Sequence, residues 1–100
     1  MEGFTILVIY KARNEGDRES FVRELTEKGV LEAIRGEDGC LAYDYYYSNE
    51  DKITLALYER WESAEHQRVH MTQPHMKTAM EIKSKYIDSV KLKRIDISDL

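Results

Sequence analysis

The chain has 100 residues and a mass of 11.8 kDa, the usual size of one domain with one hydrophobic core. Its 42% hydrophobic residues disfavour a disordered chain, and its formal charge of −4 disfavours nucleic acid as a partner. Cys40 is the single cysteine, which excludes an internal disulfide and a metal site built from several Cys ligands. The N-terminal residues lack the features of a signal peptide or membrane span, so we expect a cytoplasmic protein without a membrane partner.

The first expected elements are a strand and a helix. Residues 4–12, FTILVIYKA, are rich in β-branched and aromatic residues and predict a buried strand. Apolar residues then recur at three- and four-residue spacing from Asp17 to about Arg35, which predicts an amphipathic helix. Gly29 falls inside this pattern, where we expect a kink or a close packing contact.

The next two segments predict a β-hairpin. Residues 40–48, CLAYDYYYS, and residues 53–61, ITLALYERW, flank the turn sequence NEDK. Apolar side chains alternate onto both faces of these strands, so we expect the sheet to be covered on both sides.

Two helical segments and a strand complete the chain. Ser63 fits the N-cap of a segment that ends near His70 or Met71. Thr72 is expected to cap a second segment, with Pro74 in its first turn, and residues 89–97, SVKLKRIDI, alternate as a last strand. The order β-α-β-β-α-β predicts one ferredoxin-like α+β domain over residues 1–100, a four-stranded antiparallel sheet with its helices on one face. The bare face predicts a homodimer that closes an α+β barrel.

Two segments, GCLAYDYYYS and ALYERWESAEHQRVHMTQPHMK, resemble the antibiotic biosynthesis monooxygenase family, especially its small quinol monooxygenases. The likeness covers nearly the whole chain. Its specific part is E-x-W-E-S at residues 59–63, His70 nine residues after Trp61, and TQPHM at residues 72–76. The family implies a dimeric α+β barrel, and it includes cofactor-free oxygenases of phenols, quinols and anthrones, haem-degrading enzymes, a signal isomerase and members without known activity. Haem-degrading relatives use an Asn on the first strand, which residues 4–12 lack, so haem degradation is disfavoured.

The resemblance implies oxidation of a small quinol-like or phenolic compound by O₂, with no cofactor and no metal. Such a site needs a base, an apolar pocket and donors to an oxyanion. We expect His70 to be the base, since imidazole titrates near neutral pH, and Trp61 to contact the aromatic ring. With these two as catalytic residues, the expected substrate-binding residues are Tyr45, Tyr58, Glu59 and His75.

Structural roles compete with these assignments. A lone Trp in a small domain is first a core residue, so Trp61 suits the core, and His70 and His75 suit structural positions at helix ends. Tyr43, Tyr45 and Tyr47 alternate on one face and predict an aromatic stripe in the core or the dimer interface.

Two further side chains have open alternatives. Glu59 is expected to form an interfacial ion pair; the alternative is a partly buried acid with a raised pKa. His66 and His70 stand one helical turn apart without a third metal ligand, so we place His66 on a solvated face outside the pocket. Two other functions remain open: an isomerase or lyase of a small polar metabolite, and a module that binds an aromatic ligand without converting it.

Overall fold

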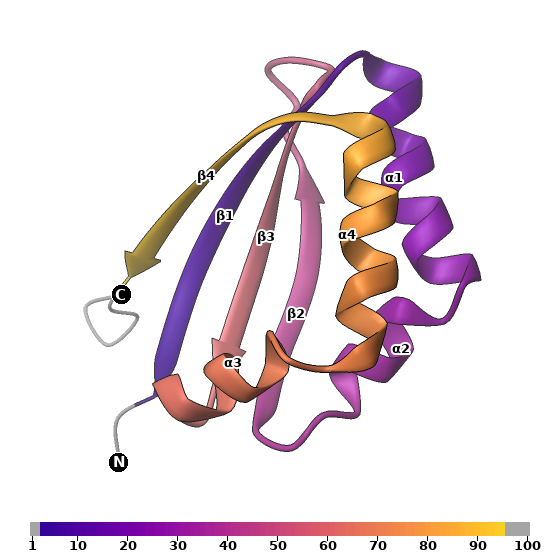
Figure 1. The fold of residues 1–100 in the computed structure, drawn as a ribbon. Coiled ribbons are helices and arrows are strands. Elements are labelled where there is room, and N and C mark those ends of the chain that lie inside the picture. The colour runs from indigo at the N-terminus through magenta and orange to yellow at the C-terminus, as the bar shows by residue number, and fades with distance from the viewer. Residues whose placement is uncertain (1–2, 96–100) are drawn as a thin grey trace.

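The computed structural model describes residues 3–95, which form one antiparallel sheet with its helices on one face (Figure 1). The strands are β1 (Phe4–Ala12), β2 (Cys40–Tyr47), β3 (Thr54–Trp61) and β4 (Ile87–Ile95), in the spatial order β2-β3-β1-β4. The helices are α1 (Glu15–Glu27), α2 (Val30–Arg35), α3 (Ala64–His70) and α4 (Pro74–Tyr86). The predicted ferredoxin-like α+β fold is therefore confirmed.

The pairing of the strands defines the two faces of the sheet. Val8 of β1 stands opposite Leu57 of β3 and Leu92 of β4. Paired residues point to the same face, so even-numbered residues of β1, odd-numbered residues of β3 and Tyr43 and Tyr45 of β2 lie under the helices. The register of β2 shifts between Cys40 and Ala42, so Cys40 stands opposite Trp61 while Leu41 is exposed. The buried core lies on this side and includes Ile6, Val8, Leu55 and Leu57 from the sheet and Phe21, Leu25, Ile34 and Ile82 from the helices.

The helix predicted over residues 17–35 is two helices. Gly29 has a φ of +74°, a left-handed conformation that ends α1 and allows α2 to begin at Val30. The helical region begins earlier than expected because the side chain of Asn14 caps it, accepting a hydrogen bond from the Asp17 amide. The expected kink at Gly29 is thus a complete break, after which α2 buries Val30 and Ile34.

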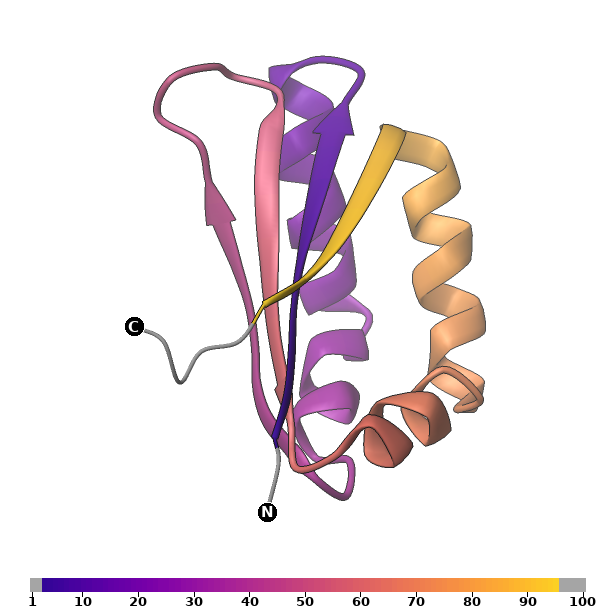
Figure 2. The same ribbon diagram turned by 90° about the vertical axis from the view of Figure 1, so that its left-hand side faces the viewer.

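The link from β3 to β4 follows the prediction with one error. Ser63 caps α3 as predicted, accepting from the His66 amide over 3.2 Å. Thr72 does not cap α4; its hydroxyl donates to the Val69 carbonyl at the end of α3, and Gln73 precedes α4 instead. In Figure 2, α3 lies at the bottom of the view, where it leads from the end of β3 to α4.

The last strand begins at Ile87, two residues before the predicted start at 89, while predicted residues 96–97 lie outside the described part of the chain. Within residues 3–95, no helix is both long and apolar enough to cross a lipid bilayer.

Candidate functional site

Trp61 ends β3 and points beneath the helices. The strand register places it opposite Phe4 of β1 and Cys40 of β2, and its side chain is fully buried. Its indole Nε1–H donates to a carboxylate oxygen of Glu59 over 3.0 Å. The alternation of a strand puts these two residues on one face, so Trp61 satisfies part of the hydrogen bonding of a buried acid.

His70 is the last residue of α3, and its side chain is only 1% exposed. Its ring centroid lies 4.7 Å from that of Trp61, with an interplanar angle of 35°, and 5.6 Å from that of Tyr43. The structure thus brings together the two residues that the sequence predicted as catalytic, in an environment of aromatic rings.

Glu37 is a site residue that the sequence analysis missed. Its Oε2 atom lies 2.9 Å from Nδ1 of His70 and 2.6 Å from Nε2 of His75, and its side chain is 9% exposed. His75, in the first turn of α4, is 23% exposed and reaches the same carboxylate from the outer side. Glu37 lies in the turn between α2 and β2, 33 residues before His70. Acidic residues are common in turns, so its position alone does not indicate a functional role. No spacing pattern in the sequence connects it with the two histidines.

Glu59 lies inside the protein rather than at an interface. It faces the helices from β3 and is buried, and its carboxylate accepts from Trp61. Burial raises the pKa of this carboxyl; the hydrogen bond from Trp61 and the nearby His70 oppose the rise, and the charge of Glu37 adds to it. The prediction of an interfacial ion pair is therefore wrong, and the alternative of a buried acid with a raised pKa is confirmed.

The tyrosines divide between the two faces of the sheet. Tyr45 lies under the helices, with its ring 6.0 Å from Tyr10 and 6.1 Å from Tyr43. Burial raises the pKa of all three hydroxyls, and the charge of Glu59 adds to this effect at Tyr10 and Tyr43, so they stay protonated at neutral pH. Tyr58 stands opposite Leu7 on the other face, so the structure does not bring it into this group. We refer to Glu37, Tyr43, Glu59, Trp61 and His70 as the inner cluster.

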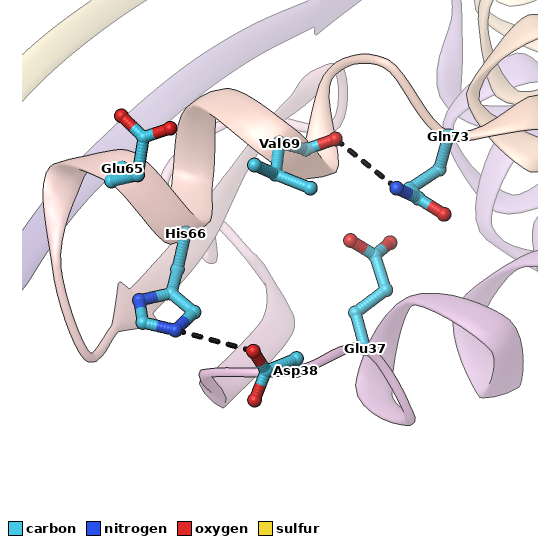
Figure 3. Close-up of a pocket in the computed structure, with 6 residues that line it drawn as sticks. All are labelled: Glu37, Asp38, Glu65, His66, Val69 and Gln73. Atoms are coloured by element: carbon cyan, nitrogen blue, oxygen red, sulfur yellow. Dashed lines mark hydrogen bonds and ion pairs between the residues drawn. The ribbon is translucent and has the colours of Figure 1, made fainter.

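A pocket of about 370 Å³ adjoins the inner cluster at Glu37 (Figure 3). It lies between the α2–β2 turn and α3, and its lining residues are Glu37, Asp38, Glu65, His66, Val69 and Gln73. Figure 3 shows the Glu37 carboxylate pointing into the space beside Val69 and Gln73, with the His66 ring next to Asp38. His66, predicted to lie outside the pocket, therefore lines the one that adjoins His70, whereas Trp61, Tyr43 and Tyr45 are not among its lining residues.

Asp38, Glu62 and His66 are the one group in residues 3–95 whose potential metal-ligand atoms all lie within 4.8 Å of one another. Nε2 of His66 lies 3.4 Å from Asp38 and 4.0 Å from Glu62. Both contacts are within ion-pair distance, and the Asp38 side chain is 92% exposed. An exposed group of this kind needs no ion to explain it, so we assign it no role in metal binding.

Comparison with known proteins extends these observations. A family model described as antibiotic biosynthesis monooxygenase matches residues 5–82. No curated protein matches the chain.

Solved structures share the fold over nearly the whole chain. PA3566 from Pseudomonas aeruginosa is 22% identical, with a TM-score of 0.80 over 95% of this chain and 93% of that one. Rv0793 from Mycobacterium tuberculosis is 24% identical, with a TM-score of 0.76 over 95% and 94%. A conserved protein of Bacteroides thetaiotaomicron, described as a possible oxidoreductase, is 24% identical, with a TM-score of 0.77 over 93% and 95%. At such low identities these similarities show the fold alone.

Proposed function

The chain belongs to the antibiotic biosynthesis monooxygenase family, and on that premise we propose that it oxidises a small phenolic or quinol-like compound with O₂ and without a cofactor. The observation that carries the proposal is the position of His70. Its buried imidazole lies against the ring of Trp61 and has the Glu37 carboxylate at Nδ1. An imidazole held in this way has Nε2 as its basic atom, the arrangement of a general base.

Transfer of the phenolic proton to Nε2 of His70 is the proposed first step. The phenolate then gives an electron to O₂ far more readily than the phenol, because it is richer in electrons. The substrate radical and superoxide combine into a peroxide on a ring carbon. Loss of water from this peroxide, with the proton returned by His70, leaves a carbonyl group. One oxygen atom enters the product and the other becomes water, and the substrate supplies all four electrons.

The side chains around His70 suit a flat, partly polar substrate. Trp61 and Tyr43 offer aromatic faces, which favour contact with another ring. Tyr43 and Tyr45 keep their protons because burial raises their pKa, so their hydroxyls can donate to a phenolate oxygen. We place the substrate against Tyr43, Tyr45, Glu59 and Trp61, within reach of His70.

The burial of His70 implies that the site opens to admit a substrate. Its side chain is 1% exposed, while the pocket next to it is lined by Glu37 and by residues of α3. α3 has seven residues and joins β3 to α4 through short links, so a small displacement of α3 would connect the pocket with the ring. We therefore place the route of the substrate between α3 and the α2–β2 turn.

A homodimer through the open face of the sheet completes the proposal. This face carries the half-buried side chains of Leu7, Ile9 and Tyr58 and exposes Tyr46. Covering such side chains is favourable, and a second copy offers the same face across a two-fold axis. Tyr58 would then lie in the interface. Analytical ultracentrifugation should show a dimer that Leu7→Lys converts to a monomer; a monomeric wild type would contradict this part of the proposal.

Oxygen consumption with a panel of hydroquinones, catechols and anthrones, repeated under ¹⁸O₂, tests the activity. We expect one labelled atom in the product and one in water. His70→Gln should lower kcat about 10²–10⁴-fold, the usual contribution of a general base. Trp61→Phe should lower it less, and Glu27→Gln, on the exposed surface of α1, should leave it unchanged. Product formed without O₂ would indicate an isomerase or lyase, and tight binding without product would indicate a binding module; either result would contradict the proposal.

A further inference from the structure

We propose that Glu37 is the positioning residue of this site and that His75 acts through Glu37 rather than on the substrate. The catalytic part of this inference rests on the proposed function, because it takes His70 as the base. The geometric part rests on the contacts of the three side chains and can be measured without a substrate.

The two histidines converge on one buried carboxylate. Oε2 of Glu37 lies 2.9 Å from Nδ1 of His70 and 2.6 Å from Nε2 of His75, and its Oε1 lies 3.2 Å from the same Nδ1. An ionised carboxylate only accepts hydrogen bonds, so both facing ring nitrogens carry a proton. Glu37 therefore selects the Nδ1–H tautomer of His70, which leaves the lone pair of Nε2 free to take a proton.

The backbone fixes the three residues in this arrangement. The amide of Glu37 donates to the Ile34 carbonyl over 3.0 Å, and the Glu37 carbonyl accepts from the Cys40 amide over 3.1 Å. The Gln73 amide donates to the His70 carbonyl over 3.1 Å, which sets the short link from His70 to His75. Because the turn after α2, the end of α3 and the start of α4 are each held in place, the carboxylate meets both rings without large rearrangement.

His75 offsets part of the free-energy cost of burying the Glu37 carboxylate. A buried carboxylate is strongly destabilising unless hydrogen-bond donors surround it. Nε2–H of His75 provides such a donor from the outer side, where the ring is 23% exposed, while His70 provides another from the inner side. His75 thus keeps Glu37 aimed at His70, a role that differs from the contact with substrate predicted from the sequence.

Glu37 also balances the charge that His70 would acquire. The groups facing His70 are Glu37 from the α2–β2 turn, Tyr43 from β2, and Glu59 and Trp61 from β3. Glu59 accepts from Trp61, whereas Glu37 lies at hydrogen-bond distance from the imidazole itself. A buried imidazolium beside a carboxylate is far more stable than one without a counter-charge, so Glu37 would favour proton transfer to His70.

Ring-nitrogen NMR on ¹⁵N-histidine-labelled protein and steady-state kinetics test this inference together. In wild type we expect the Nδ1–H tautomer of His70, with its proton facing Glu37. Glu37→Gln should give mixed tautomers, because an amide both donates and accepts, and should lower kcat about 10²–10⁴-fold with little change in KM. Glu37→Asp should keep the tautomer and part of the activity. His75→Gln should lower kcat rather than raise KM.

Glu27→Gln is the matched control, because Glu27 lies on the exposed surface of α1 and should change neither the tautomer nor kcat. An Nε2–H tautomer of His70 in wild type would overturn the inference. So would a Glu37→Gln variant with wild-type tautomer and kcat, or a His75→Gln variant with raised KM and unchanged kcat. If Glu37→Gln does not fold, the wild-type tautomer and the Glu37→Asp variant decide. If no quinol is turned over, the proposed function fails while the NMR result still decides the role of Glu37.

Discussion

The indole N–H of Trp61 donates to the buried carboxylate of Glu59 over 3.0 Å, so the residue that packs against the His70 ring also forms a hydrogen bond with a buried acid. The two residues lie two positions apart on one face of β3, and this hydrogen bond joins their side chains. The end of one strand therefore links the packing around His70 to the electrostatics of the site.

Removing the Glu59 charge should change how stability depends on pH. The folded-state pKa of Glu59 is raised above its ordinary value of 4.5, so the folded protein holds this proton more tightly than the unfolded chain. The stabilisation is complete below the ordinary value and is lost as pH rises through the raised pKa. We therefore expect wild type to lose stability relative to Glu59→Gln as the pH rises from about 4 to about 7. In urea unfolding, the free energy of unfolding of the variant minus that of wild type should increase by about 1.4 kcal/mol per unit of difference between the folded and unfolded pKa of Glu59. A difference that stays constant with pH would contradict this.

The buried tyrosines should make the protein sensitive to alkaline pH. Burial raises the pKa of Tyr10, Tyr43 and Tyr45, so their stabilising contribution is present below the ordinary pKa of 10 and is lost as pH rises above it. We expect the phenolate absorbance of these three hydroxyls to appear together with the loss of circular dichroism. Tyr43→Phe removes one of these hydroxyls. After correction for its change in stability at neutral pH, this variant should be half unfolded at a higher alkaline pH than wild type. Ionisation of all tyrosines before unfolding would refute the expected burial.

The two glycines with positive φ should differ in their tolerance of alanine. Gly29 has a φ of +74°, and a Cβ added there would meet open space. Gly29→Ala should therefore lower the free energy of unfolding only by the backbone strain, about 1–2 kcal/mol. Gly39 has a φ of +80°, and an added Cβ would lie 2.3 Å from the His66 ring, so Gly39→Ala should cost about 1–3 kcal/mol more. His66→Ala should remove most of this excess in a double-mutant cycle measured by urea unfolding. Equal costs at the two positions would show that the His66 ring moves aside freely.

Arg18 should be important for the stability of the β2–β3 hairpin. Its Nη1 donates to the carbonyls of Ser48, Asp51 and Thr54 at 3.0–3.2 Å, and the residue is 7% exposed. Arg18→Met should cost about 2–3 kcal/mol and increase amide hydrogen exchange in the hairpin loop, because these carbonyls lose a charged donor. Arg23→Met on the same helix is the control, since Arg23 is exposed and should change stability by less than about 0.5 kcal/mol. Similar effects of the two changes would mean that the loop holds its shape without Arg18.

The sequence predicted the fold well because the strands have strong local patterns. The Ile/Val-rich run of residues 4–12 matches β1 at both ends, and the alternation around Trp61 placed Glu59 and Trp61 on the same face. Boundaries set by single residues were less predictable. A glycine within an apolar helical pattern can be tolerated or can end the helix, and the pattern did not show that Gly29 takes the left-handed conformation that separates α1 from α2.

The site was only partly predictable, for a physical reason. Trp61 and His70 are close in sequence, and a strand end followed by a short helix brings them together. Glu37 reaches His70 from a turn 33 residues earlier, so its role depends on the tertiary fold. Tyr45 and Tyr58 were both predicted to bind the substrate, yet the register places them on opposite faces of the sheet.

The most direct test of His70 as the base is the binding of a nitro-substituted quinol under anaerobic conditions. Its phenolate absorbs visible light, and the pH is chosen so that the free compound is mostly protonated. Wild type should convert the bound compound to the phenolate, while His70→Gln should bind it in the protonated form. A phenolate spectrum of equal intensity with His70→Gln, or its absence from wild type at saturating ligand, would contradict proton transfer to His70.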